Sequence, residues 1–113
     1  MIVLGGKHIG DGEPCFVTFE AGPTHNGLDS AKRLARLAHK AGADAIKFQV
    51  FDPFRLVADP DLPFSYEVLV DQASGRTETV TEPLRDILAR RRLEWDEWRE
   101  LKRYCDGLNL LFF

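Results

Sequence analysis

Apolar residues recur at spacings of three and four in two segments, and this period predicts two amphipathic helices. The first set of such positions is Leu28, Ala31, Leu34, Ala35, Ala38 and Ala41. Asn26 or Asp29 is suited to cap the start of this helix, and Gly42 is suited to end it. The second helix is expected after Leu93 and before Gly107, with inward positions Trp98, Leu101, Tyr104 and Cys105.

Runs of apolar and β-prone residues predict strands over 15–19, 45–51 and 108–113. The first strand is expected to stop at the segment 20–23, where Gly22 and Pro23 interrupt it. A strand, a helix of about four turns and a second strand with short connections form a βαβ unit, whose strands are parallel and whose crossover is right-handed. The expected fold class is therefore α/β.

Two further segments surround this unit or interrupt it. Residues 1–14 predict a small hairpin, from the apolar run 2–4 and the turn signal at 10–12. Between residues 52 and 82 prolines mark loops, and the runs 66–70 and 77–80 allow a surface hairpin. Pro83 suits the first turn of another helix, whose apolar edge is Leu84, Ile87 and Leu88.

Composition narrows the class of protein. The chain has 113 residues, 44% hydrophobic and 29% charged, which is typical of one globular domain. A net charge of −3 argues against nucleic acid as a partner, and Arg90-Arg91-Arg92 lies among acidic residues that indicate a solvated helix face. No apolar run approaches the roughly 18 residues of a membrane span, and no signal-peptide layout opens the chain, so we expect a cytoplasmic protein without a membrane partner. The two cysteines, Cys15 and Cys105, are expected to be reduced and buried.

The last six residues, 108–113, are an apolar run with nothing after it. Natural termini are usually polar and frayed. We therefore expect the chain to be a fragment of a larger protein.

One face of each strand in the βαβ unit turns polar at its carboxyl end. Glu20 follows Phe16 and Thr18 on one face of the first strand, and Lys47 and Gln49 share one face of the second. Strands in a parallel sheet are usually apolar on both faces, and a buried lysine or glutamate is costly unless it is paired or faces water. Two polar strand ends at the same edge favour a shared site, because parallel α/β enzymes place their sites there. A structural Lys–Glu pair inside the sheet is the alternative.

The loop from Glu20 to Gly27 carries further candidates. A Gly-rich turn before a helix can receive an anion, although this spacing matches neither a P-loop nor a dinucleotide fingerprint. His25 either packs or caps the loop, or it contacts a substrate or its surroundings. We count His25 and its neighbour Asn26 as candidate substrate-binding residues. No group of side chains has the spacing of a metal site, so no metal ligand is assigned.

Two motifs resemble a known family. Residues 20–27 read Glu-Ala-Gly-Pro-Thr-His-Asn-Gly, and residues 41–49 read Ala-Gly-Ala-Asp-Ala-Ile-Lys-Phe-Gln. Together they are similar to the N-terminal part of the N-acetylneuraminate (sialic acid) synthases and their legionaminic and pseudaminic acid relatives. The hairpin at 1–14 and the segment 97–105 resemble the element before the barrel and the second barrel helix of that family.

This resemblance implies the N-terminal portion of a (β/α)8 TIM barrel, with residues 1–14 as an entry hairpin and residues 15–113 as the first three strands and their helices. It implies an enzyme that condenses phosphoenolpyruvate with N-acetylmannosamine or a related amino sugar, releases phosphate and forms a nine-carbon 2-keto acid. Lys47 would bind phosphoenolpyruvate, Gln49 and Glu20 would contact the sugar, and Glu20 would be the catalytic group that assists proton transfer. The divalent metal of the family, manganese or magnesium, would have its ligands outside this chain, and the enzyme would be a homo-oligomer.

The loop departs from the family pattern at three positions. Ala21 replaces Ile, and Pro23 and Thr24 replace Val and Asn. The change removes a polar side chain and one N–H donor, so the preferred sugar can differ from N-acetylmannosamine. Taken alone, the chain is expected to be inactive. The alternative is a non-catalytic, shortened homologue that pairs with itself or with a partner to complete its sheet.

Overall fold

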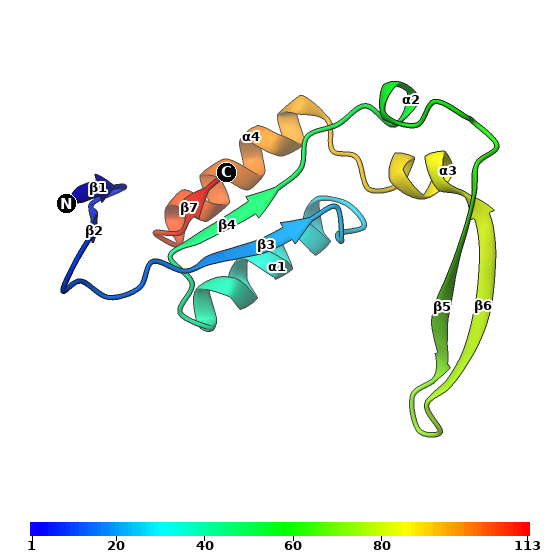
Figure 1. Cartoon of the computed structure of the whole chain (residues 1–113), viewed down its shortest axis with the longest axis horizontal. Coiled ribbons are helices and arrows are strands. Elements are labelled where there is room, and N and C mark those ends of the chain that lie inside the picture. The colour runs from blue at the N-terminus through cyan, green and yellow to red at the C-terminus, as the bar shows by residue number, and fades with distance from the viewer. The chain divides into compact units, whose positions relative to one another are not determined.

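Three parallel strands form the central sheet of the protein, in a computed structural model that describes residues 1–113 (Figure 1). The strands are β3 (Thr18–Gly22), β4 (Ala45–Phe48) and β7 (Leu111–Phe112), in the order β3-β4-β7. Helix α1 (Leu28–Lys40) connects β3 to β4, so the predicted βαβ unit is confirmed. The chain divides into two compact units, residues 1–50 with 93–113 and residues 51–92.

Helix α4 (Trp95–Gly107) packs beside α1 and contributes to the same core. A capping box starts α4, in which the Glu94 side chain accepts from the backbone and the Glu97 side chain accepts from the Glu94 N–H. The inward positions Trp98, Leu101 and Cys105 are buried as predicted. On the sheet they meet Ile46 and Phe48, and on α1 they meet its stripe of small residues, Ala31, Ala35 and Ala38. The core therefore lies on one face of the sheet, between the strands and the two helices.

Strand β3 begins later than predicted and continues past Glu20 to Gly22. Its other side has no strand partner in the structure, and the apolar side chains of Val17 and Phe19 are 50% and 39% exposed. Cys15 is also exposed, because it precedes the strand, so the prediction that both cysteines are buried is wrong for Cys15. The expectation that Asn26 or Asp29 caps α1 is wrong as well. Gly27 holds the capping position with no side-chain hydrogen bond.

The predicted N-terminal hairpin is present as β1 (Ile2–Leu4) and β2 (Lys7–Ile9). Its turn is Gly5-Gly6, not the glycines at 10–12, and both residues have positive φ as a two-residue hairpin turn requires. The Leu111 side chain lies directly against Gly5, where an added Cβ would come within 2.2 Å of it. The Lys7 ammonium also pairs with the Asp44 carboxylate at 2.9 Å, so the hairpin is held at the amino ends of β4 and β7.

The second unit consists of a long hairpin and two short helices. The hairpin is β5 (Pro63–Asp71) with β6 (Arg76–Pro83), which confirms the suggested surface hairpin and extends it at both ends. Helix α3 (Leu84–Ala89) follows Pro83 as predicted, whereas α2 (Pro53–Leu56) was predicted as loop. Arg90 and the Tyr66 hydroxyl donate to the Glu82 carboxylate, and these hydrogen bonds lower the pKa of Glu82 to about 2. This network ties the hairpin to the residue that follows α3.

None of the helices in the protein has the length and apolar character needed to cross a bilayer.

Candidate functional site

Glu20 and Lys47 form an ion pair across the two neighbouring strands. They are opposite each other in the parallel register of β3 and β4, and the Lys47 Nζ atom lies 2.8 Å from Glu20 Oε2. Both side chains are about half exposed, on the face of the sheet away from the core. The Lys–Glu pair considered as the alternative is therefore formed, but it is half exposed rather than buried inside the sheet. The pair is accessible to a ligand from solvent.

Gln49 joins this pair at the carboxyl ends of the strands, just after β4 ends at Phe48. Gly22 is a neighbour of both Glu20 and Gln49. A Cβ added to Gly22 would lie 3.4 Å from Glu20 Oε1 and 3.5 Å from Gln49 Nε2. The structure thus brings together three of the predicted site residues, Glu20, Lys47 and Gln49, and we call them the strand-end cluster. The importance of Gly22 was not predicted, although a glycine at a strand end is a signal of a bulge or of a close approach.

A bulge in β3 shapes the strand-end cluster. Glu20 pairs with Lys47 and Gly22 pairs with Phe48, so Ala21 is an extra residue with no partner on β4. Ala21 is buried in the core, and Gly22 takes a left-handed backbone conformation with φ of 52°. Bulges bend a strand and re-aim its side chains, and they are common beside active sites.

The strand-end cluster offers complementary chemistry. A lysine ammonium binds phosphate or carboxylate oxygens, a glutamate carboxylate accepts hydrogen bonds and protons, and a glutamine amide both donates and accepts. The arrangement can therefore hold an anionic group and a hydroxyl-bearing group side by side.

His25 and Asn26 lie differently. His25 is fully buried, and its ring packs edge-on against Phe48 and Trp98, with centroids 5.9 Å and 6.3 Å away. Its Nδ1 atom accepts a hydrogen bond from the Gly27 N–H at 3.3 Å. This position corresponds to the packing role considered for His25, and Asn26 is exposed beside it. Their contact with a substrate stays a prediction.

Comparison with known proteins gives the family. The NeuB family model matches residues 34–113. The chain belongs to the NeuB family. It is 32% identical over 111 residues to human N-acetylneuraminate-9-phosphate synthase, with 95% of this chain and 28% of the relative covered. It is 48% identical over 56 residues to the N,N'-diacetyllegionaminic acid synthase of Legionella pneumophila, with 49% of this chain and 16% of the relative covered.

A solved structure agrees with this assignment. The crystal structure of N-acetylneuraminic acid (sialic acid) synthetase from Leptospira borgpetersenii, in complex with citrate, superposes with a TM-score of 0.70 at 26% identity. The alignment covers 99% of this chain and 32% of that one. This NeuB family chain thus has an α/β fold like that of the solved synthetase. It covers 28% of the length of the human relative and 32% of the length of the Leptospira chain.

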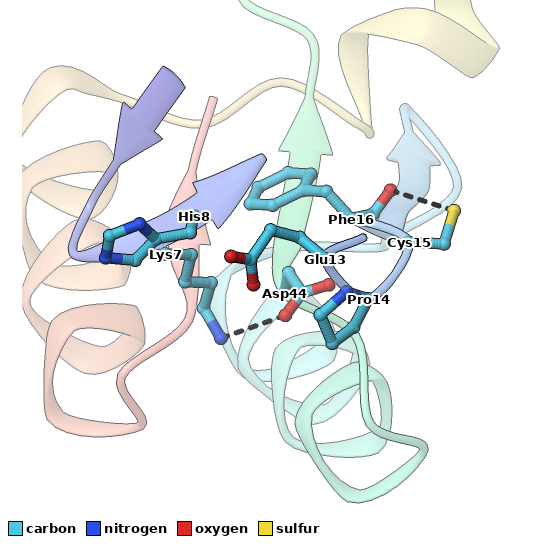
Figure 2. A pocket seen from close by; sticks show the side chains of 7 residues that line it. All are labelled: Lys7, His8, Glu13, Pro14, Cys15, Phe16 and Asp44. Carbon is cyan, nitrogen blue, oxygen red and sulfur yellow. Dashed lines mark hydrogen bonds and ion pairs between the residues drawn. The ribbon is translucent and has the colours of Figure 1, made fainter. Parts of the chain in front are cut away.

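A pocket of about 200 Å³ lies at the opposite end of the sheet from the strand-end cluster (Figure 2). It is lined by residues that precede β3 and β4 and by strand β2: Lys7, His8, Glu13, Pro14, Cys15, Phe16 and Asp44. Figure 2 shows the Lys7 ammonium directed at the Asp44 carboxylate, which also accepts from the Val17 N–H at 2.8 Å. The Val17 hydrogen bond and then the Lys7 hydrogen bond lower the pKa of Asp44. Lys7 and Asp44 therefore neutralise each other and hold the hairpin to the sheet, and we do not assign the site there.

The residues present do not fit the divalent metal that the family resemblance implies. No group of three or more His, Cys, Asp or Glu side chains comes together in the structure. A strand-end cluster with one carboxylate, one ammonium and one amide is a poor donor set for such an ion. We therefore derive no step through a metal.

Proposed function

We propose that residues 1–113 supply one side of the active site of a nonulosonic acid synthase. The reaction condenses phosphoenolpyruvate with N-acetylmannosamine or a related amino sugar, forms a nine-carbon 2-keto acid and releases phosphate. The observation that carries the proposal is the strand-end cluster: a cation, a carboxylate and an amide meet at the carboxyl ends of parallel strands. The names of the relatives, a sialic acid synthase and a legionaminic acid synthase, support the same class of product.

Each member of the strand-end cluster has a role in this proposal. Lys47 binds an anionic group of phosphoenolpyruvate, because its ammonium is exposed on the open face of the sheet. Gln49 hydrogen-bonds the amino sugar, and Glu20 accepts from a sugar hydroxyl and takes part in proton transfer. When Lys47 turns to the anion, the Glu20 carboxylate is released from their ion pair and becomes available to the sugar.

His25 is buried and packs beneath the loop that follows β3, and Asn26 is exposed on that loop. The Thr24 hydroxyl, which stands where the family has Asn, donates to the Ala21 carbonyl at 2.7 Å. It is therefore engaged in closing the turn. We propose that this change, with Pro23 beside it, alters which amino sugar is preferred.

We also propose that the three strands are part of a (β/α)8 barrel. Parallel strands with both helices on one face, and polar strand ends on the other, are typical of a barrel wall with its site at the carboxyl ends. In this proposal the enzyme uses manganese or magnesium, whose ligands are not among these residues.

The test uses the complete polypeptide that contains residues 1–113, purified and supplied with Mn²⁺. Phosphate release is followed with phosphoenolpyruvate and a panel of amino sugars, each substrate also being omitted in turn. We expect release that requires both substrates and a 2-keto acid product detected by mass spectrometry. Release that continues without any amino sugar, or no release with the whole panel, would contradict the proposal.

A non-catalytic role is favoured by a different observation, the exposed Val17 and Phe19 beside the unpaired side of β3. Unpaired strand edges with apolar side chains are prone to pair with another chain. In this second proposal the chain is a self-pairing or partner-completing module. Size-exclusion chromatography with light scattering discriminates, because a stable monomer of residues 1–113 contradicts self-pairing. The synthase proposal expects homo-oligomers only of the complete polypeptide.

A further inference from the structure

Asp44 lies where the N-terminal hairpin meets the strands of the central sheet, and the proposed function gives it no role. Its Oδ2 atom accepts a hydrogen bond from the Val17 N–H at 2.8 Å, and its own N–H donates to the Val17 carbonyl at 2.8 Å. Its Oδ1 atom accepts from the Lys7 ammonium at 2.9 Å (Figure 2), and its carbonyl accepts from the Leu111 N–H at 3.1 Å. We call the two hydrogen bonds between Val17 and Asp44 the amino-end clasp.

The amino-end clasp is in register with the strand-end cluster. Val17 stands three residues before Glu20 on one strand, and Asp44 stands three residues before Lys47 on the other. The ladder between the clasp and the cluster pairs β3 and β4 residue for residue, because the bulge comes only after Glu20. When the clasp is closed, this ladder therefore puts Glu20 opposite Lys47.

Backbone pairing and the alternation of buried and exposed positions do not by themselves select this register. A slip of one residue would turn the buried side chains of a strand to the open face, so the core excludes it. A slip of two residues keeps every side chain on its face, because the faces alternate with a period of two. Glu20 would then lie opposite position 45 or 49 and lose its partner Lys47. The clasp excludes this slip, since an aspartate side chain cannot follow an N–H that moves about 6.5 Å along the strand.

We propose that Asp44 is a positioning residue, whose clasp on Val17 sets the register that brings the strand-end cluster together. This role rests on the proposed synthase function for its effect on catalysis, and it deepens that function. Asp44 touches no substrate, because it lies at the opposite end of the sheet. Its two carboxylate oxygens have separate tasks, one in the clasp and the other in the ion pair that holds the hairpin.

Disulfide trapping in the complete polypeptide reads the register directly. Glu20→Cys with Lys47→Cys places two thiols on opposite positions, where neighbouring strands are about 4.8 Å apart and a disulfide can form. Glu20→Cys with Gln49→Cys can be bridged only after a slip. The rate of the 20–49 crosslink relative to the 20–47 crosslink, mapped by mass spectrometry, should rise about tenfold when Asp44→Ala is added, the effect of one hydrogen bond to a charged group. An unchanged ratio would overturn the proposal.

Steady-state kinetics of single variants test the consequence for the site. Asp44→Ala should lower kcat/KM for both substrates about tenfold. Asp44→Asn should stay within about threefold of wild type, because its amide oxygen still accepts from the Val17 N–H although the ion pair with Lys7 is lost. Val17→Pro has no N–H to donate and should resemble Asp44→Ala.

Lys7→Met is the matched control, because it loses the same ion pair and leaves the clasp intact. It should keep kcat/KM within about twofold of wild type. If Asp44 served only to anchor the hairpin, Asp44→Asn and Lys7→Met would be impaired as much as Asp44→Ala, and the positioning role would be rejected.

Failure of this role and failure of the proposed function are distinguishable. An inactive wild-type polypeptide rejects the synthase function, while disulfide trapping still decides the register. An active wild type whose Asp44→Ala variant keeps its kcat/KM rejects only the role of Asp44. If Asp44→Ala does not fold, trapping is carried out with Val17→Pro in its place, and an unchanged crosslink ratio there rejects the role equally.

Discussion

Cys105 should resist alkylation in the folded protein by a large factor. Its side chain is fully buried on α4 within the core, and burial, with a smaller effect of Asp106, raises its pKa from 9.0 to about 11. At pH 8 the thiolate fraction then falls from about 9% to about 0.1%, a reduction of roughly a hundredfold. Because the thiolate is the nucleophile, the alkylation rate should fall by at least this factor.

The assay is iodoacetamide labelling at pH 8, with quantification of the Cys15 and Cys105 peptides by mass spectrometry. The exposed Cys15 is the internal reference, and the same Cys105 peptide in concentrated urea gives the unprotected rate. We expect Cys15 to be labelled first and Cys105 to be labelled only on unfolding. Equal rates for Cys105 in buffer and in urea would refute the packing of α4 against the sheet.

The same pKa shift predicts a change of stability in alkali. Between pH 9.0 and about 11 the unfolded chain loses the Cys105 proton while the folded chain keeps it. The unfolded state then binds fewer protons, so the free energy of unfolding should fall as the pH rises through this range. Cys105→Ala should remove this part of the pH dependence in urea titrations, and an unchanged slope would contradict the shift.

Three other predictions concern the core, the hairpin anchor and the site. Leu101→Ala should lower the free energy of unfolding by about 2–5 kcal/mol in urea titrations, whereas the half-exposed Leu37→Ala should change it by about 0.5 kcal/mol or less. The pKa of Asp44 is lowered chiefly by the Val17 N–H, so its contribution to stability is present above pH 3.8 and should be lost as the pH falls through the lowered pKa. Asp44→Ala should flatten that acid limb of the stability curve. Lys47→Ala should raise the KM for phosphoenolpyruvate about 10–100-fold with a smaller effect on the sugar, and unchanged kinetics would remove Lys47 from the site.

The helices and the parallel unit could be predicted because their signals are local. The spacing of three and four that marks α1 and α4 is set by helix geometry alone, and a strand–helix–strand order with short joints allows only one common arrangement. The meeting of Glu20 with Lys47 and Gln49 followed from the same reasoning. Alternation fixes the face of a strand, and parallel pairing brings the carboxyl ends together.

Other features were missed, either because they depend on contacts between distant segments or because a local signal was interpreted otherwise. The bulge at Ala21 appears only in the pairing of β3 with β4, where Glu20 pairs with Lys47 and Gly22 with Phe48. Short α2 was missed because Pro53 was interpreted as a loop signal, although Asp52 caps it and proline fits the first helical position. Cys15 was expected to be buried from residue type alone, and its exposure follows from the later start of β3.

The contact between Gly5 and Leu111 has a consequence for the order of events during synthesis. The hairpin turn lies against a side chain that is 106 positions further along the chain. At translation rates of about 5–20 residues per second, roughly 5–20 seconds separate the synthesis of these two positions. During that interval the hairpin of β1 and β2 cannot make its packing contact with Leu111 of β7. The hairpin therefore reaches its final place against Leu111 only after β7 has emerged from the ribosome.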